Sequence, residues 1–96
     1  MTIGFDFSPE VEALRVQIRD FIENVVKPAE QEIKDGGDRE ALVKGVVKMR
    51  KEARNRGLWL PHMPEEWGGM GLGNVELAMV SAEAARSSYG PYAMKC

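Results

Sequence analysis

The residues best suited to acid–base chemistry lie in one stretch, residues 57–73. His62 is the only histidine of the chain, and Glu65 and Glu66 follow it as adjacent carboxylates. No serine or cysteine stands where it could complete a catalytic triad with His62, so its place between two prolines predicts a structural role. Adjacent carboxylates in a loop usually cap backbone donors or pair with arginines, so neither is assigned as a general base. The residues alone therefore predict no active site.

The same stretch ends in Gly69-Met70-Gly71-Leu72-Gly73. A G-x-G-x-G pattern before a helix could cradle a phosphate. It lacks the G-x-G-x-x-G spacing, the Walker lysine and the leading apolar strand of known cradles, so we interpret it as a structural turn. We expect Pro61 and Pro64 to hold their predecessors extended. Apolar side chains predict that this loop packs against the body of the protein: Leu58, Trp59, Leu60, Met63, Trp67, Met70 and Leu72.

Three further groups of residues have both a functional and a structural interpretation. A basic cluster could bind nucleic acid, but no aromatic residue is interleaved with it and cations suit a helix C-terminus, so we expect no nucleic acid partner. The cluster consists of Lys44, Lys48, Arg50, Lys51, Arg54 and Arg56. Glu83 and Arg86, three residues apart, predict an intrahelical ion pair. The methionines could line an apolar pocket or fill the core: Met63, Met70, Met79 and Met94.

Composition limits the protein to one small domain, residues 1–96. The net charge of −2 argues against a dedicated nucleic-acid binder or a polybasic membrane surface. A single cysteine, Cys96, excludes an internal disulfide and fits a reducing compartment, and one histidine with one cysteine offers no metal cluster. Neither a targeting segment nor an apolar run of membrane-spanning length is apparent, so we expect a soluble cytoplasmic protein with no membrane partner.

The elements that position these residues are helices. Ser8, Pro9 and Glu10 are typical of a helix start, and apolar residues then recur every three to four positions as far as Ile33. We expect Pro28 to kink or break this helix near residues 26–27. Asp35-Gly36-Gly37 ends it.

Two more helices follow the first. Asp38 caps the second, which ends before Gly57 and has a buried stripe of Ala41, Leu42, Val46, Met49 and Ala53. The third is capped by Gly73 or Asn74 and runs to Ser88, before Gly90-Pro91 stops it. It is apolar or small nearly all round, so it needs more cover than the other helices provide. The sequence predicts an all-α bundle of about three to four helices and a chain that is a fragment or requires a partner surface.

The loop also carries a family resemblance. Met63-Pro64-Glu65-Glu66-Trp67-Gly68-Gly69-Met70-Gly71-Leu72 resembles the Pro-Glu-Glu-x-Gly-Gly-x-Gly segment of the acyl-CoA dehydrogenase family. Further segments resemble that family's first three helices: residues 7–10, 14–15, 19–21, 26–28, 53–58, 74–78 and 83–87. Residues 58–61 and 90–93 are similar to the branch whose animal members carry a fused phosphotransferase-like region. The match covers essentially the whole chain, but only the family's amino-terminal helical domain.

The resemblance implies an enzyme that dehydrogenates an acyl-CoA between its α and β carbons. In the family a glutamate takes the α proton, FAD takes the β hydride, and electrons pass to an electron-transfer flavoprotein. Neither that glutamate nor the FAD-binding residues have a counterpart here, so we expect the chain alone to be inactive and to bind no FAD.

By position in the family, this domain covers one side of the flavin and acyl pocket. That position makes Tyr89, Tyr92 and Met94 the candidates to approach an acyl chain. The resemblance also implies, as partners, the missing β and C-terminal helical domains and further copies in a homo-oligomer. The alternative is a free-standing helical module for interaction or oligomerisation.

Overall fold

The computed structural model describes residues 8–61, 63–67 and 69–94, and the predictions made for His62 and Cys96 lie outside this range. The helices are α1 (Pro9–Phe21), α2 (Lys27–Gly36), α3 (Arg39–Asn55), α4 (Asn74–Ala84) and the short α5 (Gly90–Met94). No strand occurs among the described residues, which confirms the predicted all-α fold. Within the same residues, no helix is both long and apolar enough to span a bilayer.

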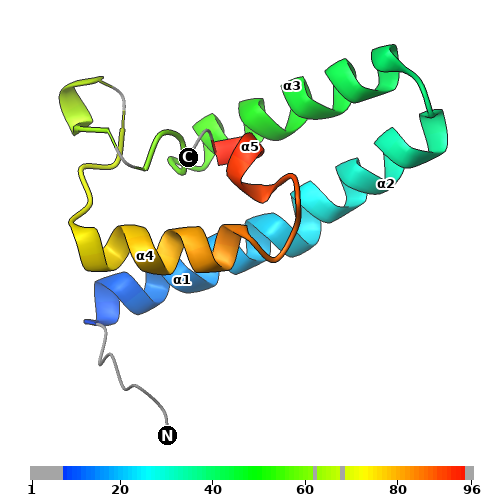
Figure 1. The fold of residues 1–96 in the computed structure, drawn as a ribbon. Coiled ribbons are helices and arrows are strands. Elements are labelled where there is room, and N and C mark those ends of the chain that lie inside the picture. Colours follow the sequence, from blue (N-terminus) through cyan, green and yellow to red (C-terminus); the bar gives the residue numbers. More distant parts are fainter. Residues whose placement is uncertain (1–7, 62, 68, 95–96) are drawn as a thin grey trace, which may run out of the picture.

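The first two helices form one continuous rod, joined by a π-helical turn at Ile22–Val26 (Figure 1). Pro28 has no N–H, and its ring would collide with the Asn24 carbonyl in a regular α-helix. The helix instead widens into a π-helical turn, in which the Lys27 N–H donates to the carbonyl of Ile22, five residues back. The predicted irregularity is therefore present, but the helix is not broken.

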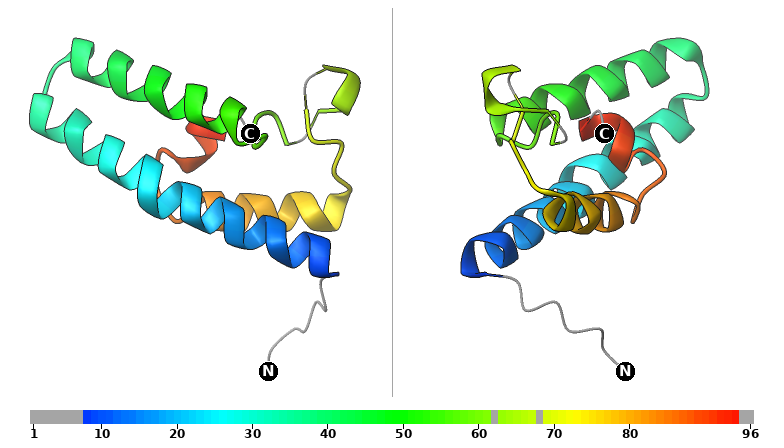
Figure 2. Two further views of the ribbon diagram at one scale, coloured as in Figure 1. Left: turned by 180° about the vertical axis from the view of Figure 1, so that it is seen from behind. Right: turned by 60° about the vertical axis from the view of Figure 1, so that its left-hand side comes forward.

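Local signals set most helix ends where the sequence predicted them. The Ser8 hydroxyl accepts a hydrogen bond from the Val11 N–H at 3.3 Å and caps α1. Gly37, at φ 67°, ends α2 in the left-handed conformation. The Asp38 carboxylate accepts from the Ala41 N–H at 2.8 Å and starts α3. The two-residue connection folds α3 back antiparallel to α2 (Figure 2).

The other helices complete a flat molecule with extents of 42 × 36 × 16 Å. Helix α4 lies along α1, and α5 returns between α4 and α3 (Figures 1 and 2). The fully buried large side chains of the core come from α1, the π-helical turn, α3, α4, α5 and the loop: Ile18, Phe21, Ile22, Val26, Met49, Leu58, Pro61, Val80 and Met94. Helix α2 adds the smaller or less deeply buried Ala29 and Ile33. The predicted stripe of α3 is wrong at Leu42, which is 39% exposed because it lies near the tip of the α2–α3 hairpin.

The end of α4 differs from the prediction. The helix stops at Ala84 instead of Ser88, and Gly90-Pro91 begin α5 instead of stopping a helix. A proline fits the first turn of a helix because the N–H it lacks has no partner there. Gly90 is required for packing, since a Cβ at this position would lie 1.8 Å from the Ala84 carbonyl oxygen.

Candidate functional site

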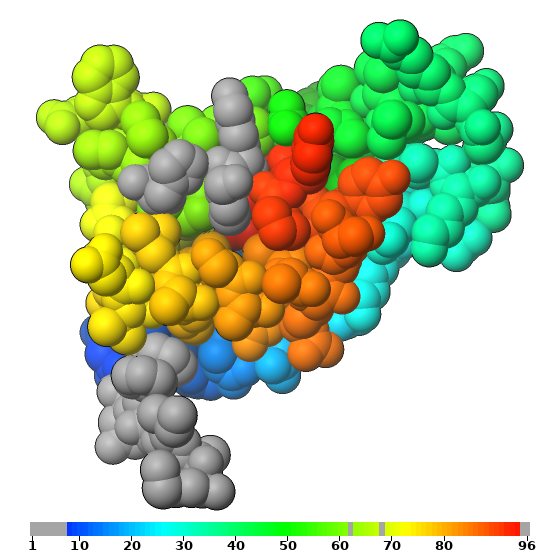
Figure 3. Space-filling model, viewed as in Figure 1, coloured from blue at the N-terminus to red at the C-terminus, as the bar shows by residue number. Residues whose placement is uncertain are grey.

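A groove runs beside the outer face of α4. Val80 and Ala84 face the core, whereas Val75 is 52% exposed. The groove has a volume of about 480 Å³ and is lined by Arg15, Asn74, Val75, Ala78, Met79, Ala82 and Glu83. Figure 3 shows α4 open to solvent across the front of the molecule, between α1 and α5. This exposure agrees with the expectation that the helix needs further cover, and the mainly apolar lining suits an apolar surface better than a charged ligand.

Glu83 closes one side of this groove and ties α4 to α1. It is 8% exposed. Its Oε1 accepts from Arg15 Nη1 at 3.2 Å and from Arg19 Nη2 at 3.1 Å, and its Oε2 accepts from Arg19 Nε at 3.3 Å. The predicted ion pair with Arg86 is wrong, because α4 ends first and Arg86 reaches Glu23 at 3.1 Å. A carboxylate held by two guanidinium groups fixes the packing of two helices.

Neighbouring cations lower the pKa values of two surface carboxylates on α1 and the π-helical turn. The hydrogen bond from Arg15 lowers the pKa of Glu12. Lys27 and then Arg86 lower the pKa of Glu23 in the same way. General acids and bases need pKa values near the working pH, and these shifts are in the opposite direction. The carboxylates therefore support helix packing and do not form a proton-transfer site.

The glycine-rich loop is bonded to itself. The Gly69 N–H donates to the Pro64 carbonyl at 3.0 Å, and the Gly71 N–H donates to the Met63 carbonyl at 2.9 Å. A Cβ on Gly69 would lie 2.1 Å from the Met63 carbonyl oxygen. These amides are therefore not available to a phosphate, and the glycines allow close backbone packing, which confirms the structural turn.

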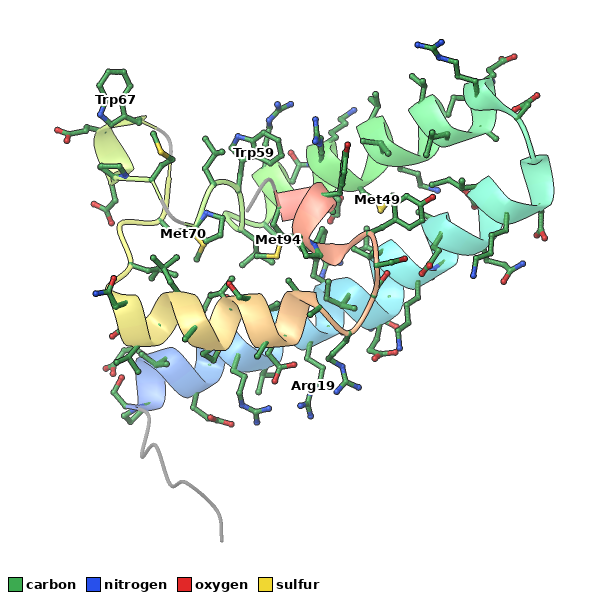
Figure 4. The ribbon with its side chains drawn as sticks, in the orientation of Figure 1. Arg19, Met49, Trp59, Trp67, Met70 and Met94 are labelled. Atoms are coloured by element: carbon green, nitrogen blue, oxygen red, sulfur yellow. The ribbon has the colours of Figure 1, made fainter. Side chains whose placement is uncertain are left out.

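Two predictions about the loop are wrong. Leu60 precedes a proline but has φ 51°, not an extended conformation. Hydrogen bonds hold it there, from the Leu60 N–H to the Met94 carbonyl at 3.0 Å and from the Met63 N–H to the Leu60 carbonyl at 3.1 Å. Trp67 does not pack but is 67% exposed, because it lies on a short 3₁₀ turn, Glu65–Trp67, at the margin of the molecule (Figure 4).

The three residues proposed to approach an acyl chain do not share one surface. Met94 is fully buried, Tyr92 is 62% exposed, and Tyr89 is partly buried against the core. The carbonyl of Tyr92 accepts a hydrogen bond from Arg50 Nε at 3.1 Å. Of the three, Tyr92 offers most surface to a ligand, and the contact of these residues with an acyl chain stays a prediction.

The fold places aromatic rings beside the basic cluster, where the sequence predicted none. The Arg54 guanidinium lies 4.3 Å from the ring centre of Trp59. The Arg50 guanidinium lies 5.8 Å from Trp59 and 5.4 Å from Tyr92. The rings come from the loop and from α5, so the sequence of α3 could not reveal them. Trp59, soon after the helix end, was the one nearby signal.

The chain is similar to a known protein family. A profile of the family described as "Acyl-CoA dehydrogenase, N-terminal domain" matches residues 8–95, which is nearly the whole chain. Neither the curated proteins nor the solved structures gave a significant match. The profile does not separate branches within the family, so the likeness to the branch with a fused phosphotransferase-like region stays a prediction.

Proposed function

The chain belongs to the acyl-CoA dehydrogenase family as an N-terminal domain, and we propose that it covers the flavin and acyl-chain pocket of a FAD-dependent acyl-CoA dehydrogenase. In this proposal the β and C-terminal helical domains carry the catalytic glutamate and the cofactor site. Electrons leave the complete enzyme through an electron-transfer flavoprotein. The enzyme acts in the cytoplasm as a homo-oligomer, and the chain alone catalyses no reaction.

The exposed apolar face of α4 is the observation that carries the proposal. Val75, Ala78 and Ala82 line the groove from one side of the helix, and Val75 is 52% exposed. Burial of such surface against another domain is favourable by about 25 cal/mol per Å² of apolar area. Two alanines also let a neighbouring backbone approach closely. A domain whose least polar helix is half covered is suited to dock on the rest of a larger enzyme.

Within the part of the chain that the structure describes, the glycine-rich loop and the start of α4 do not fit the pyrophosphate of FAD. The amides of Gly69, Met70 and Gly71 bond to carbonyls of the same loop. The first turn of α4 carries Glu76, whose Oε2 would lie 2.8 Å from a Cβ on Gly73, the residue that caps the helix. A carboxylate at the helix N-terminus occupies the place where an anion would bind and repels it. We therefore assign FAD to the other domains of the complete enzyme and to no residue of this chain.

Domain complementation tests the proposal. The chain is mixed with the β and C-terminal helical domains of a related acyl-CoA dehydrogenase, and the affinity is measured by calorimetry. Ala82→Arg places an unpaired charge in the contact, so we expect binding at least about 100-fold weaker. Ser81→Arg adds the same charge on an exposed position outside the groove lining and should leave the affinity within about threefold.

Failure to bind would favour the second candidate, a free-standing helical interaction or oligomerisation module. The exposed apolar face of α4 is compatible with that function as well. A stable oligomer of the chain that is disrupted by Ala82→Arg, without any affinity for the other domains, would establish it. Equal effects of Ala82→Arg and Ser81→Arg would instead exclude the groove as the docking surface for either function.

A further inference from the structure

The outer side of α3 presents a basic and apolar surface distant from the α4 groove. Val43, Val47, Arg50 and Arg54 follow one another at steps of four, three and four residues, so they lie on one side of the helix. Val43 is 53% exposed and Val47 is 60% exposed. We call this surface the arginine face, and it comprises Val43, Val47, Arg50, Arg54, Trp59 and Tyr92.

The arginines of this face are pre-positioned, and no described carboxylate pairs with them. Other arginines pair with carboxylates in the folded chain: Arg15, Arg19, Arg56 and Arg86. Within the described ranges, Arg50 and Arg54 make no ion pair and instead lie against the rings of Trp59 and Tyr92. Stacking orients the guanidinium plane of each arginine. Arg50 Nε donates to the Tyr92 carbonyl at 3.1 Å, which leaves its two Nη groups available to a carboxylate. The face therefore presents two oriented guanidinium groups that can bind acidic side chains.

A surface of opposite character lies on the loop. We call residues 65–67 the acidic turn. Glu65 and Glu66 are exposed, and neither forms an ion pair with any residue that the structure describes. Trp67, beside them, is 67% exposed. Exposed tryptophans next to charged groups are typical anchors of protein–protein contacts.

Hydrogen bonds within the loop hold the acidic turn. The Trp67 N–H donates to the Pro64 carbonyl at 3.0 Å, and the Gly69 N–H donates to the same carbonyl at 3.0 Å. Glu65 lies over Gly71, where a Cβ would approach its Cγ to 3.2 Å. Because the turn is already ordered, docking it requires little further loss of conformational entropy.

The two surfaces lie on the same side of the molecule. Figure 4 places both Trp59 and Trp67 along the edge formed by α3 and the loop, away from α1 and α4. We propose that two copies of the chain pair about a twofold axis, with the acidic turn of each docked on the arginine face of the other. In such a contact Glu65 and Glu66 face Arg50 and Arg54.

The geometry favours a second copy over an unrelated partner. In a twofold dimer the acidic turn of each copy binds the arginine face of the other, so the same contact forms twice. Both surfaces of both copies are then occupied, and none remains to bind a third copy and extend a fibre. In the same contact Trp67 covers the exposed valines of α3, which would otherwise stay in water. The α4 groove is not involved, so dimerisation leaves that docking surface free.

Charge reversal on each surface tests the proposal. Sedimentation velocity and light scattering of the full chain should give a dimer that weakens when the salt concentration is raised. Glu65→Arg/Glu66→Arg makes both surfaces positive, and Arg50→Glu/Arg54→Glu makes both negative. Each variant alone should raise the dimer dissociation constant at least about tenfold. Lys44→Glu/Lys48→Glu changes the charge of α3 by the same amount, but beside the arginine face. This control should change the dimer dissociation constant less than about threefold.

The decisive sample is an equimolar mixture of the two reversed variants. In that mixture a positive turn meets a negative face and a negative turn meets a positive face, so a heterodimer should form from chains that do not self-associate. Circular dichroism checks that each variant is folded. If Arg50→Glu/Arg54→Glu does not fold, Trp67→Ala on the exposed turn must still weaken the dimer.

Three results would overturn the proposal: a monomeric wild-type chain, a dimer insensitive to both reversals, or a mixture that stays monomeric. A dimer disrupted by Ala82→Arg and unaffected by the reversals would locate the interface at the α4 groove, which also contradicts it. None of these results depends on the enzyme domains, so they leave the proposed function to its own test.

Discussion

Replacing Glu83 by glutamine should measurably loosen the contact between α1 and α4. The side chain keeps its shape but loses the charge that accepts three hydrogen bonds from Arg15 and Arg19. Such charge-assisted bonds stabilise more than neutral ones, by about 1 kcal/mol each in a buried site. The arginine side chains are 26% and 46% exposed, so solvent screens part of this difference. We therefore expect a loss of about 2 kcal/mol in the free energy of unfolding.

Urea unfolding followed by far-ultraviolet circular dichroism measures this loss. For a domain of this size, about 2 kcal/mol corresponds to a fall of roughly 8–16 °C in the melting temperature. Glu12→Gln is the matched control, because Glu12 pairs with Arg15 but its side chain is 47% exposed, and it should cost less than about 0.5 kcal/mol. Equal effects of the two substitutions, or no effect of Glu83→Gln, would show that burial of Glu83 does not stabilise the fold.

Two other predictions concern packing and pH. Gly90→Ala places a Cβ 1.8 Å from the Ala84 carbonyl oxygen and should destabilise by about 3 kcal/mol. Gly57→Ala, whose Cβ would meet nothing within 4 Å at φ 72°, should cost only about 1 kcal/mol of backbone strain. Equal losses in urea unfolding would contradict the packing role of Gly90. The pKa values of Glu12, Asp20 and Glu23 are lowered by hydrogen bonds from Arg15, Arg56 and Lys27. These carboxylates therefore contribute fully to the free energy of unfolding above their ordinary pKa values, 4.5 for Glu and 3.8 for Asp. That contribution is lost as the pH falls through the lower pKa values of the folded state. Melting temperatures measured from pH 7 to pH 2 should fall in that acidic range, and less steeply in Asp20→Asn; a parallel profile for Asp20→Asn would contradict this assignment.

Signals carried by neighbouring residues could be read from the sequence. Ser8, Gly37 and Asp38 act within four residues of their own positions, and each determines a helix end as predicted. The resemblance at residues 63–72 likewise identified the family, because the motif is contiguous. Features that depend on one short stretch of chain, such as a helix end or a contiguous motif, can thus be predicted without the structure.

Features set by distant residues could not be read in the same way. Glu83 and Arg86 have the spacing of an intrahelical pair. Arg15 and Arg19, which lie 68 and 64 positions before Glu83 in the chain, bind its carboxylate instead. Gly90-Pro91 is equally suited to stop one helix or to start the next, and the packing of α5 decides between them. The candidate docking surfaces depend on tertiary structure too, since Trp59 reaches Arg54 only after the loop has folded.

Flavin reduction in the complemented enzyme tests the central claim most directly. The chain is combined with the β and C-terminal helical domains of a related acyl-CoA dehydrogenase loaded with FAD, and the flavin absorbance is followed as an acyl-CoA is added. We predict a yellow complex that contains the chain and is bleached by acyl-CoA faster than the two domains alone. Bleaching that is unchanged by the chain, or a chain that stays outside the complex, would contradict its role as the cover of the pocket.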